Sequence, residues 1–166
     1  MKISILGIGQ PLRGDDGAGP ETVRRWRRDF PSSDPSIETV FLETPGLGLL
    51  EYLEAADAAI LVDAVSSGAP AGTLHAVSLP AAPDPTPGEK TAHGFGVAES
   101  IALARNIGTR LPEHLLLIGI EAEGFAPGSG LSDAVRTAIP EAAGKIQETV
   151  ERWKALPDQD FAHRKP

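Results

Sequence analysis

Short apolar runs recur along this chain and predict the strands of one sheet. The first run starts at Ile3 and is rich in β-branched residues, which is typical of a buried strand. The run Ala58–Val62 is apolar throughout, as expected of a central parallel strand that is covered on both faces. The segment Thr73–Leu79 alternates in the manner of an edge strand. Two further runs predict strands at Ile37–Leu42 and His114–Ile120.

Segments compatible with helix lie between these runs. They are Pro20–Phe30, Leu47–Ala55, Val97–Arg105 and a last region from Ser132 or Asp133 to about Lys154. We expect Pro140 to divide the last region into two helices, because proline lacks the amide hydrogen that a helix interior needs. The alternation of strands and helices predicts an α/β fold, a three-layer sandwich with a mostly parallel sheet of about five strands and helices on both faces. Residues 1–155 are expected to form one domain, and residues 156–166 a flexible tail.

The segment Gly7–Gly19 is a glycine-rich loop that joins the first strand to the first helix. Such loops usually face a ligand, but this one does not suit a phosphate. Leu12 stands where a dinucleotide fingerprint needs its third glycine, and Asp15 and Asp16 stand where a P-loop needs lysine and a hydroxyl. Two carboxylates would repel an anion, so the loop favours a cation or an acid–base role. One of the two could simply cap the helix.

A second carboxylate and an imidazole are predicted at the same end of the sheet. Asp63 follows the central strand, at the edge where open α/β sheets place their ligands. His93 precedes the helix Val97–Arg105, where the helix dipole favours the neutral ring that binds metals. Asp16, Asp63 and His93 would therefore converge on a site suited to Ni²⁺ or Zn²⁺. Glu121 and Glu123 are possible further acids, whereas His75 is interpreted as a partly buried or surface residue without a catalytic role.

The first predicted helix carries four arginines around Trp26. They could form a docking patch for an acidic partner. A solvated helix face with Trp26 turned inward is the preferred interpretation.

Composition narrows the classes of function. The net charge of −8 argues against nucleic acid as the main partner, because phosphate binding needs clustered cations. There is no cysteine, which excludes disulfides, a thiol nucleophile and cysteine-based zinc sites. No apolar run approaches the roughly 20 residues of a membrane span, and no signal peptide is recognisable. We therefore expect a cytoplasmic protein, and a monomer.

Three motifs together resemble those of the hydrogenase maturation proteases. They are the string from Gly7 to Gly19, the Asp63 motif Leu61-Val62-Asp63-Ala64 and the pair His93-Gly94. Members of this family are endopeptidases that remove a C-terminal extension from the precursor of the nickel-iron hydrogenase large subunit. The resemblance implies that Asp16, Asp63 and His93 form the catalytic and metal-binding triad. It also implies that the nickel is supplied by the substrate, so that the free protein needs no metal of its own.

The residues leave the mechanism open. The substrate's metal could polarise the scissile carbonyl or activate water, or a carboxylate such as Asp16 or Asp15 could act as general base on water. A covalent acyl-enzyme is disfavoured, because there is no cysteine and no Gly-x-Ser-x-Gly elbow. Two other functions stay possible: a non-catalytic nickel chaperone or checkpoint for the same precursor, and a different hydrolase on a similar scaffold.

Overall fold

The computed structural model describes residues 1–79 and 96–157. Its centre is a five-stranded sheet in the order β2-β1-β3-β5-β4. The first four strands in this order are mutually parallel, and β4 runs antiparallel to β5. The strands are β1 (Ile3–Ile8), β2 (Ile37–Leu42), β3 (Ala58–Val65), β4 (Leu74–Ser78) and β5 (His114–Glu121). The predicted mostly parallel sheet is confirmed, and β4 is the predicted edge strand.

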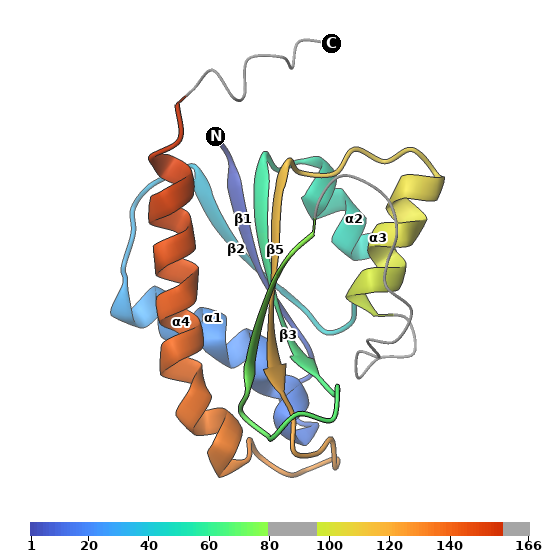
Figure 1. Ribbon diagram of the computed structural model, residues 1–166, viewed down its shortest axis with the longest axis vertical. Coiled ribbons are helices and arrows are strands. Elements are labelled where there is room, and N and C mark those ends of the chain that lie inside the picture. The colour runs from blue at the N-terminus through green and yellow to red at the C-terminus, as the bar shows by residue number, and fades with distance from the viewer. Residues whose placement is uncertain (80–95, 158–166) are drawn as a thin grey trace.

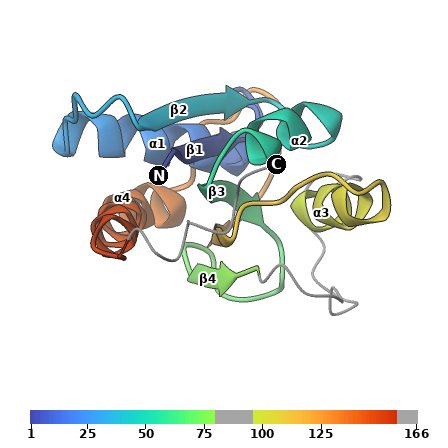
Figure 2. The ribbon, with the colours of Figure 1, turned by 90° about the horizontal axis from the view of Figure 1, so that it is seen from above.

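Helices cover both faces of the sheet, as Figures 1 and 2 show. One face packs against α1 (Ala18–Asp29) and α4 (Asp133–Lys154), and the other against α2 (Leu47–Glu54) and α3 (Val97–Asn106). Alternation along the strands divides the core accordingly: Ile60 and Val62 of β3 face α1 and α4, whereas Leu61 faces α2 and α3. The predicted three-layer sandwich is therefore confirmed. No helix in the two described ranges is both long and apolar enough to cross a bilayer.

The predicted break of the last helix at Pro140 is wrong. Helix α4 is continuous over 22 residues and contains Pro140 in its interior. Ser132 caps its first turn by accepting a hydrogen bond from the Val135 amide (3.3 Å), and Ile146, Val150 and Trp153 are buried on its inner face. Pro140 lies on the exposed side of the helix, where water can solvate the carbonyl that lost its amide partner. Burial of the opposite face is thus enough to keep the helix in one piece.

Pro140→Ala is expected to stabilise the protein by about 1–3 kcal/mol, because alanine restores the amide donor and removes the ring's clash with the preceding turn. Urea denaturation followed by circular dichroism would measure this change. Ala134→Gly, at a half-buried position of the same helix, is the matched control that should lower stability instead. A loss of stability in Pro140→Ala would mean that the proline ring makes packing contacts that outweigh its backbone cost.

Two glycines of the first loop are required by close backbone approach. Gly9 has φ of +128°, and a Cβ placed there would lie 1.8 Å from the carbonyl oxygen of Asp16. A Cβ on Gly19 would lie 2.3 Å from the carbonyl oxygen of Val62 and 2.4 Å from that of Ile8. The start of α1 therefore rests directly on β1 and β3. This contact brings the loop with its two aspartates to the carboxyl edge of the sheet.

Candidate functional site

Buried carboxylates gather at the carboxyl edge of the parallel strands. Asp15 and Asp16 belong to the short 3₁₀ helix η1 (Gly14–Gly17), which follows β1 and contacts β3. Asp63 lies inside β3, which runs two residues further than Asp63, and Glu121 is the last residue of β5. All four side chains are at most 1% exposed. Ionisable groups this deeply buried need a specific structural or chemical role.

Asp16 and Asp63 both lie within the described residues. The elements that carry them, η1 and β3, contact each other. The Gln10 amide donates a hydrogen bond to Asp16 Oδ2 (3.0 Å), which fixes the orientation of that carboxylate within the loop. Asp63 follows Val62, the β3 residue that pairs with Gly7 of β1. By strand alternation its side chain lies on the sheet face that α2 and α3 cover. His93, the third predicted site residue, lies outside the described residues.

Asp15 has a different role from its neighbour. Its Oδ1 accepts a hydrogen bond from the Ser132 amide (2.6 Å), and its Oδ2 accepts from the amides of Glu123 (2.8 Å) and Gly124 (3.3 Å). The Asp15 amide in turn donates to the Gly124 carbonyl (3.0 Å). Asp15 therefore ties η1 to both ends of the segment between β5 and α4. The N-cap residue of α1 is Gly17, so neither aspartate occupies the capping position of this helix.

Glu121 organises the loop between β3 and β4. Its carboxylate accepts hydrogen bonds from the Ser67 amide (2.7 Å), the Ser67 hydroxyl (2.8 Å) and the Gly68 amide (2.9 Å). His75 Nε2 lies 3.1 Å from the same carboxylate. Burial raises the pKa of Glu121, but these hydrogen bonds outweigh it and hold the pKa below its ordinary value. Glu121 is therefore a negatively charged anchor rather than a proton donor at neutral pH.

The sequence alone identified part of this arrangement. It placed Glu121 near the site edge, and β5 ends there. It did not connect His75 to Glu121, because that pair joins two strands that are far apart in the sequence and antiparallel. His114 lies at the opposite edge of the sheet, where it pairs in register with Ala58 and stacks on Trp153 (5.8 Å between ring centroids).

Glu121→Gln is expected to destabilise the protein by about 1–3 kcal/mol at pH 7, because an amide nitrogen would face donors that now meet a carboxylate oxygen. Since folding lowers the pKa of Glu121, its stabilising effect is present above the unfolded value of about 4.3 and is lost as pH falls through the folded value. Urea titrations at pH 7 and pH 3 should therefore show the difference shrinking at acidic pH. An equal difference at both pH values would contradict this assignment.

Comparison with known proteins assigns the chain to a family. A sequence model described as "Hydrogenase maturation protease" matches residues 35–149. The hydrogenase expression/formation protein HupD of Bradyrhizobium diazoefficiens is 32% identical over 92% of this chain and 79% of its own length. HoxM of Cupriavidus necator is 29% identical over 93% of this chain and 77% of its own, and the hydrogenase 2 maturation protease of Escherichia coli is 28% identical over 88% of both.

Solved structures agree at the level of the fold. The hydrogenase maturating endopeptidase HybD of Escherichia coli superimposes with a TM-score of 0.74 over 92% of this chain and 93% of its own, at 24% identity. The maturation protease HycI of Thermococcus kodakarensis gives a TM-score of 0.70 over 90% and 92%, at 22% identity. The sequence matches make the assignment: the chain belongs to the hydrogenase maturation protease family and is a peptidase.

Proposed function

We propose that this protein removes the C-terminal extension of a nickel-iron hydrogenase large-subunit precursor once nickel has been inserted. One observation carries the proposal: two carboxylates, Asp16 and Asp63, are buried on contacting elements at the ligand-binding edge of a parallel sheet. Membership of the maturation protease family supplies the reaction class. The protein would act as a monomer in the cytoplasm, on a partner that still carries its extension.

The nickel in this proposal belongs to the substrate. Asp16, Asp63 and His93 would contact it, and two carboxylates with one imidazole form a donor set that suits a divalent first-row metal. Asp16 is already oriented by the Gln10 amide, so that carboxylate needs little rearrangement when a substrate arrives. Recognition of nickel by these side chains would make cleavage a test that insertion is complete.

The chain's own residues would orient the scissile peptide and the attacking water. Asp16 and Asp63 stand near the scissile bond whether a carboxylate takes the proton from water or the substrate's nickel activates it. Asp15 is unsuited to the base role, because three backbone amides occupy its two oxygens. Of the two aspartates in the glycine-rich loop, Asp16 is therefore the one proposed to act on the substrate, either as a contact to its nickel or as the general base on water.

Cleavage of a purified large-subunit precursor, followed by intact-mass spectrometry, tests the proposal. The precursor is prepared with and without nickel, and wild-type protein is compared with His93→Ala. Release of a short C-terminal peptide by wild-type protein from the nickel-loaded precursor alone is the expected result. Binding without cleavage would favour a checkpoint or chaperone. Equal cleavage of both precursor forms would remove nickel recognition from the proposal.

A further inference from the structure

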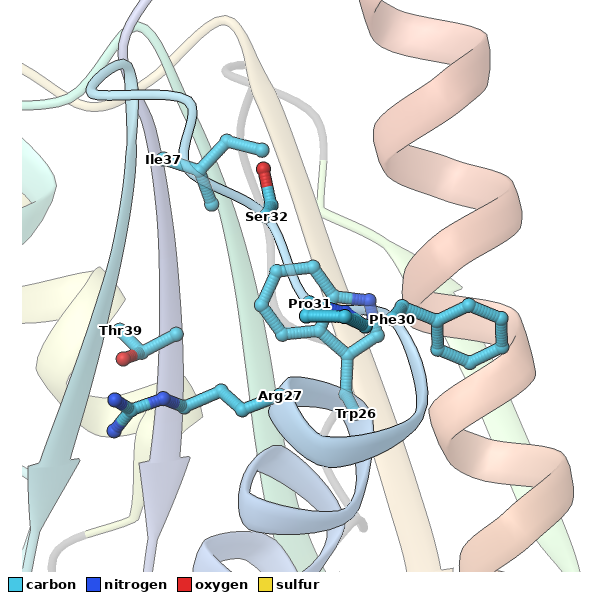
Figure 3. Close-up of a pocket in the computed structure, with 7 residues that line it drawn as sticks. All are labelled: Trp26, Arg27, Phe30, Pro31, Ser32, Ile37 and Thr39. Carbon is cyan, nitrogen blue, oxygen red and sulfur yellow. The ribbon is translucent and has the colours of Figure 1, made fainter.

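A shallow groove runs between the end of α1 and the edge strand β2, and Figure 3 shows its lining. It has a volume of about 260 Å³. Trp26 forms its floor and is only 3% exposed, while Ile37 and Thr39 line it from β2. The Arg27 side chain extends from α1 towards Thr39 (Figure 3). The groove thus combines an apolar floor, a hydroxyl and a guanidinium.

The arginines of α1 give this face a positive charge within a protein of net charge −8. Arg25 and Arg28 both pair with Asp29, and Arg24 pairs with Glu21 (3.5 Å). Arg27 has no carboxylate partner anywhere in residues 1–79 and 96–157. Four arginines therefore face two carboxylates, and Arg27 is the one available to an external anion. The buried Trp26 confirms that this side chain is turned inward, whereas the arginines around it are not fully neutralised.

The backbone of β2 adds hydrogen-bonding groups beside these arginines. Within the described part of the chain, β2 pairs with β1 on one side only. The carbonyls of Ser36 and Leu42 accept bonds from β1 and from the residue after it, so even-numbered residues of this strand point towards β1. By alternation, the amide and carbonyl groups of Thr39 and Phe41 point outward. Edge groups of this kind are a template for an added strand.

Side chains on the same edge would meet such a strand. Phe41 is 39% exposed, and the Arg24 guanidinium lies 5.2 Å from the centre of its ring. An added strand would lie about 4.8 Å from β2, and every second side chain would project over the α1 side of the sheet. Carboxylates at those positions would come within reach of Arg27 and Arg24, while apolar neighbours could cover Phe41.

The edge strand leads to the candidate site. The Leu42 carbonyl at the end of β2 accepts a hydrogen bond from the Gly9 amide (2.8 Å), and the next amide, of Gln10, holds Asp16 (3.0 Å). A peptide bound along β2 would therefore be carried towards the loop that presents Asp16. This continuity favours, as the occupant, a segment of the polypeptide on which the site acts.

We propose that an extended, acidic segment of the precursor docks on the outer edge of β2, pairing with Thr39 and Phe41 and placing a carboxylate at Arg27. The proposal rests on the precursor-processing function and specifies how the substrate is held. The interaction contributes affinity, so its loss raises KM and leaves kcat largely intact.

Arg27→Glu tests this docking surface. Cleavage kinetics on nickel-loaded precursor should show KM raised at least tenfold, because a like charge replaces the attraction. Arg152→Glu, an exposed arginine on α4 that does not line the groove, makes the same change in net charge and should leave KM unchanged. Amide exchange of Thr39 and Phe41 should slow when Asp16→Asn protein binds the precursor.

The outcomes separate this inference from the proposed function. Suppose that wild-type protein cleaves the precursor, that Arg27→Glu has the same KM as wild type, and that the amides of Thr39 and Phe41 exchange no more slowly in the complex. These results would overturn the docking surface and leave the proposed function standing. Binding without cleavage would overturn the function, and the affinity ratio of the two variants would still decide the surface. Absence of binding to the precursor would overturn both.

Discussion

Asp63→Asn is expected to reduce the rate of precursor cleavage by about 10²- to 10⁴-fold, the range typical of losing a positioned acid–base or charge-stabilising group. Asparagine has the same shape as aspartate, so the fully buried site in β3 keeps its packing while losing the carboxyl group. Asp16→Asn should have an effect of the same order, because both carboxylates lie at the proposed scissile bond. Single-turnover cleavage of nickel-loaded precursor, quantified by mass spectrometry, measures both.

A matched control distinguishes the loss of a carboxylate at the site from a simple change in the protein's net charge. Asp133→Asn removes a negative charge from a fully exposed side chain at the start of α4 and should leave the cleavage rate unchanged. Urea denaturation should show that Asp63→Asn remains folded. Cleavage within threefold of wild type by both Asp16→Asn and Asp63→Asn would contradict the assignment of these two carboxylates to the site.

Additivity offers a second test of this pair. If the two carboxylates act on the same step, the double variant should be little slower than the slower single variant. If the two carboxylates contribute independently, the fold-reductions in cleavage rate of the two single variants should multiply in the double variant. That result would mean that Asp16 and Asp63 serve different steps, for example water activation and substrate binding.

Much of the fold could be predicted because its signals are local. The apolar runs of β3 and β5 are buried on both faces, so burial of their residues is visible in the sequence itself. Pro140 was misjudged because its cost of about 3 kcal/mol is local, whereas the compensating burial of the helix face is a tertiary effect.

The site was predictable only where chain position fixes geometry. Asp63 could be placed because the ends of parallel strands share one edge. The separate roles of Asp15 and Asp16 could not, because they depend on which neighbour faces the amides of the segment 123–132. The side chains of adjacent loop residues can point in different directions, and the composition of the loop does not indicate which side chain points where.

Asp15→Ala is expected to destabilise the protein by about 3–5 kcal/mol, the largest stability effect among these predictions. Three backbone amides would lose a charged acceptor at once, and a hydrogen bond to a charged group contributes about 1.5–3 kcal/mol, less where water can replace the lost acceptor. Urea denaturation of wild-type and variant protein measures the loss. Because the denatured chain is little changed, the transition midpoint should move while the slope stays constant.

The neighbouring variant provides the contrast that makes this prediction specific. Asp16→Asn should slow cleavage by about 10²- to 10⁴-fold and shift the unfolding midpoint little, since asparagine can still accept the Gln10 hydrogen bond. Asp15→Asn should fall between the two in stability, because it keeps one oxygen acceptor but turns an amide group towards other backbone donors. If Asp15→Ala were as stable as wild type yet inactive, the roles of the two aspartates would have to be exchanged: Asp15 would be the chemical group, and Asp16 would hold the loop.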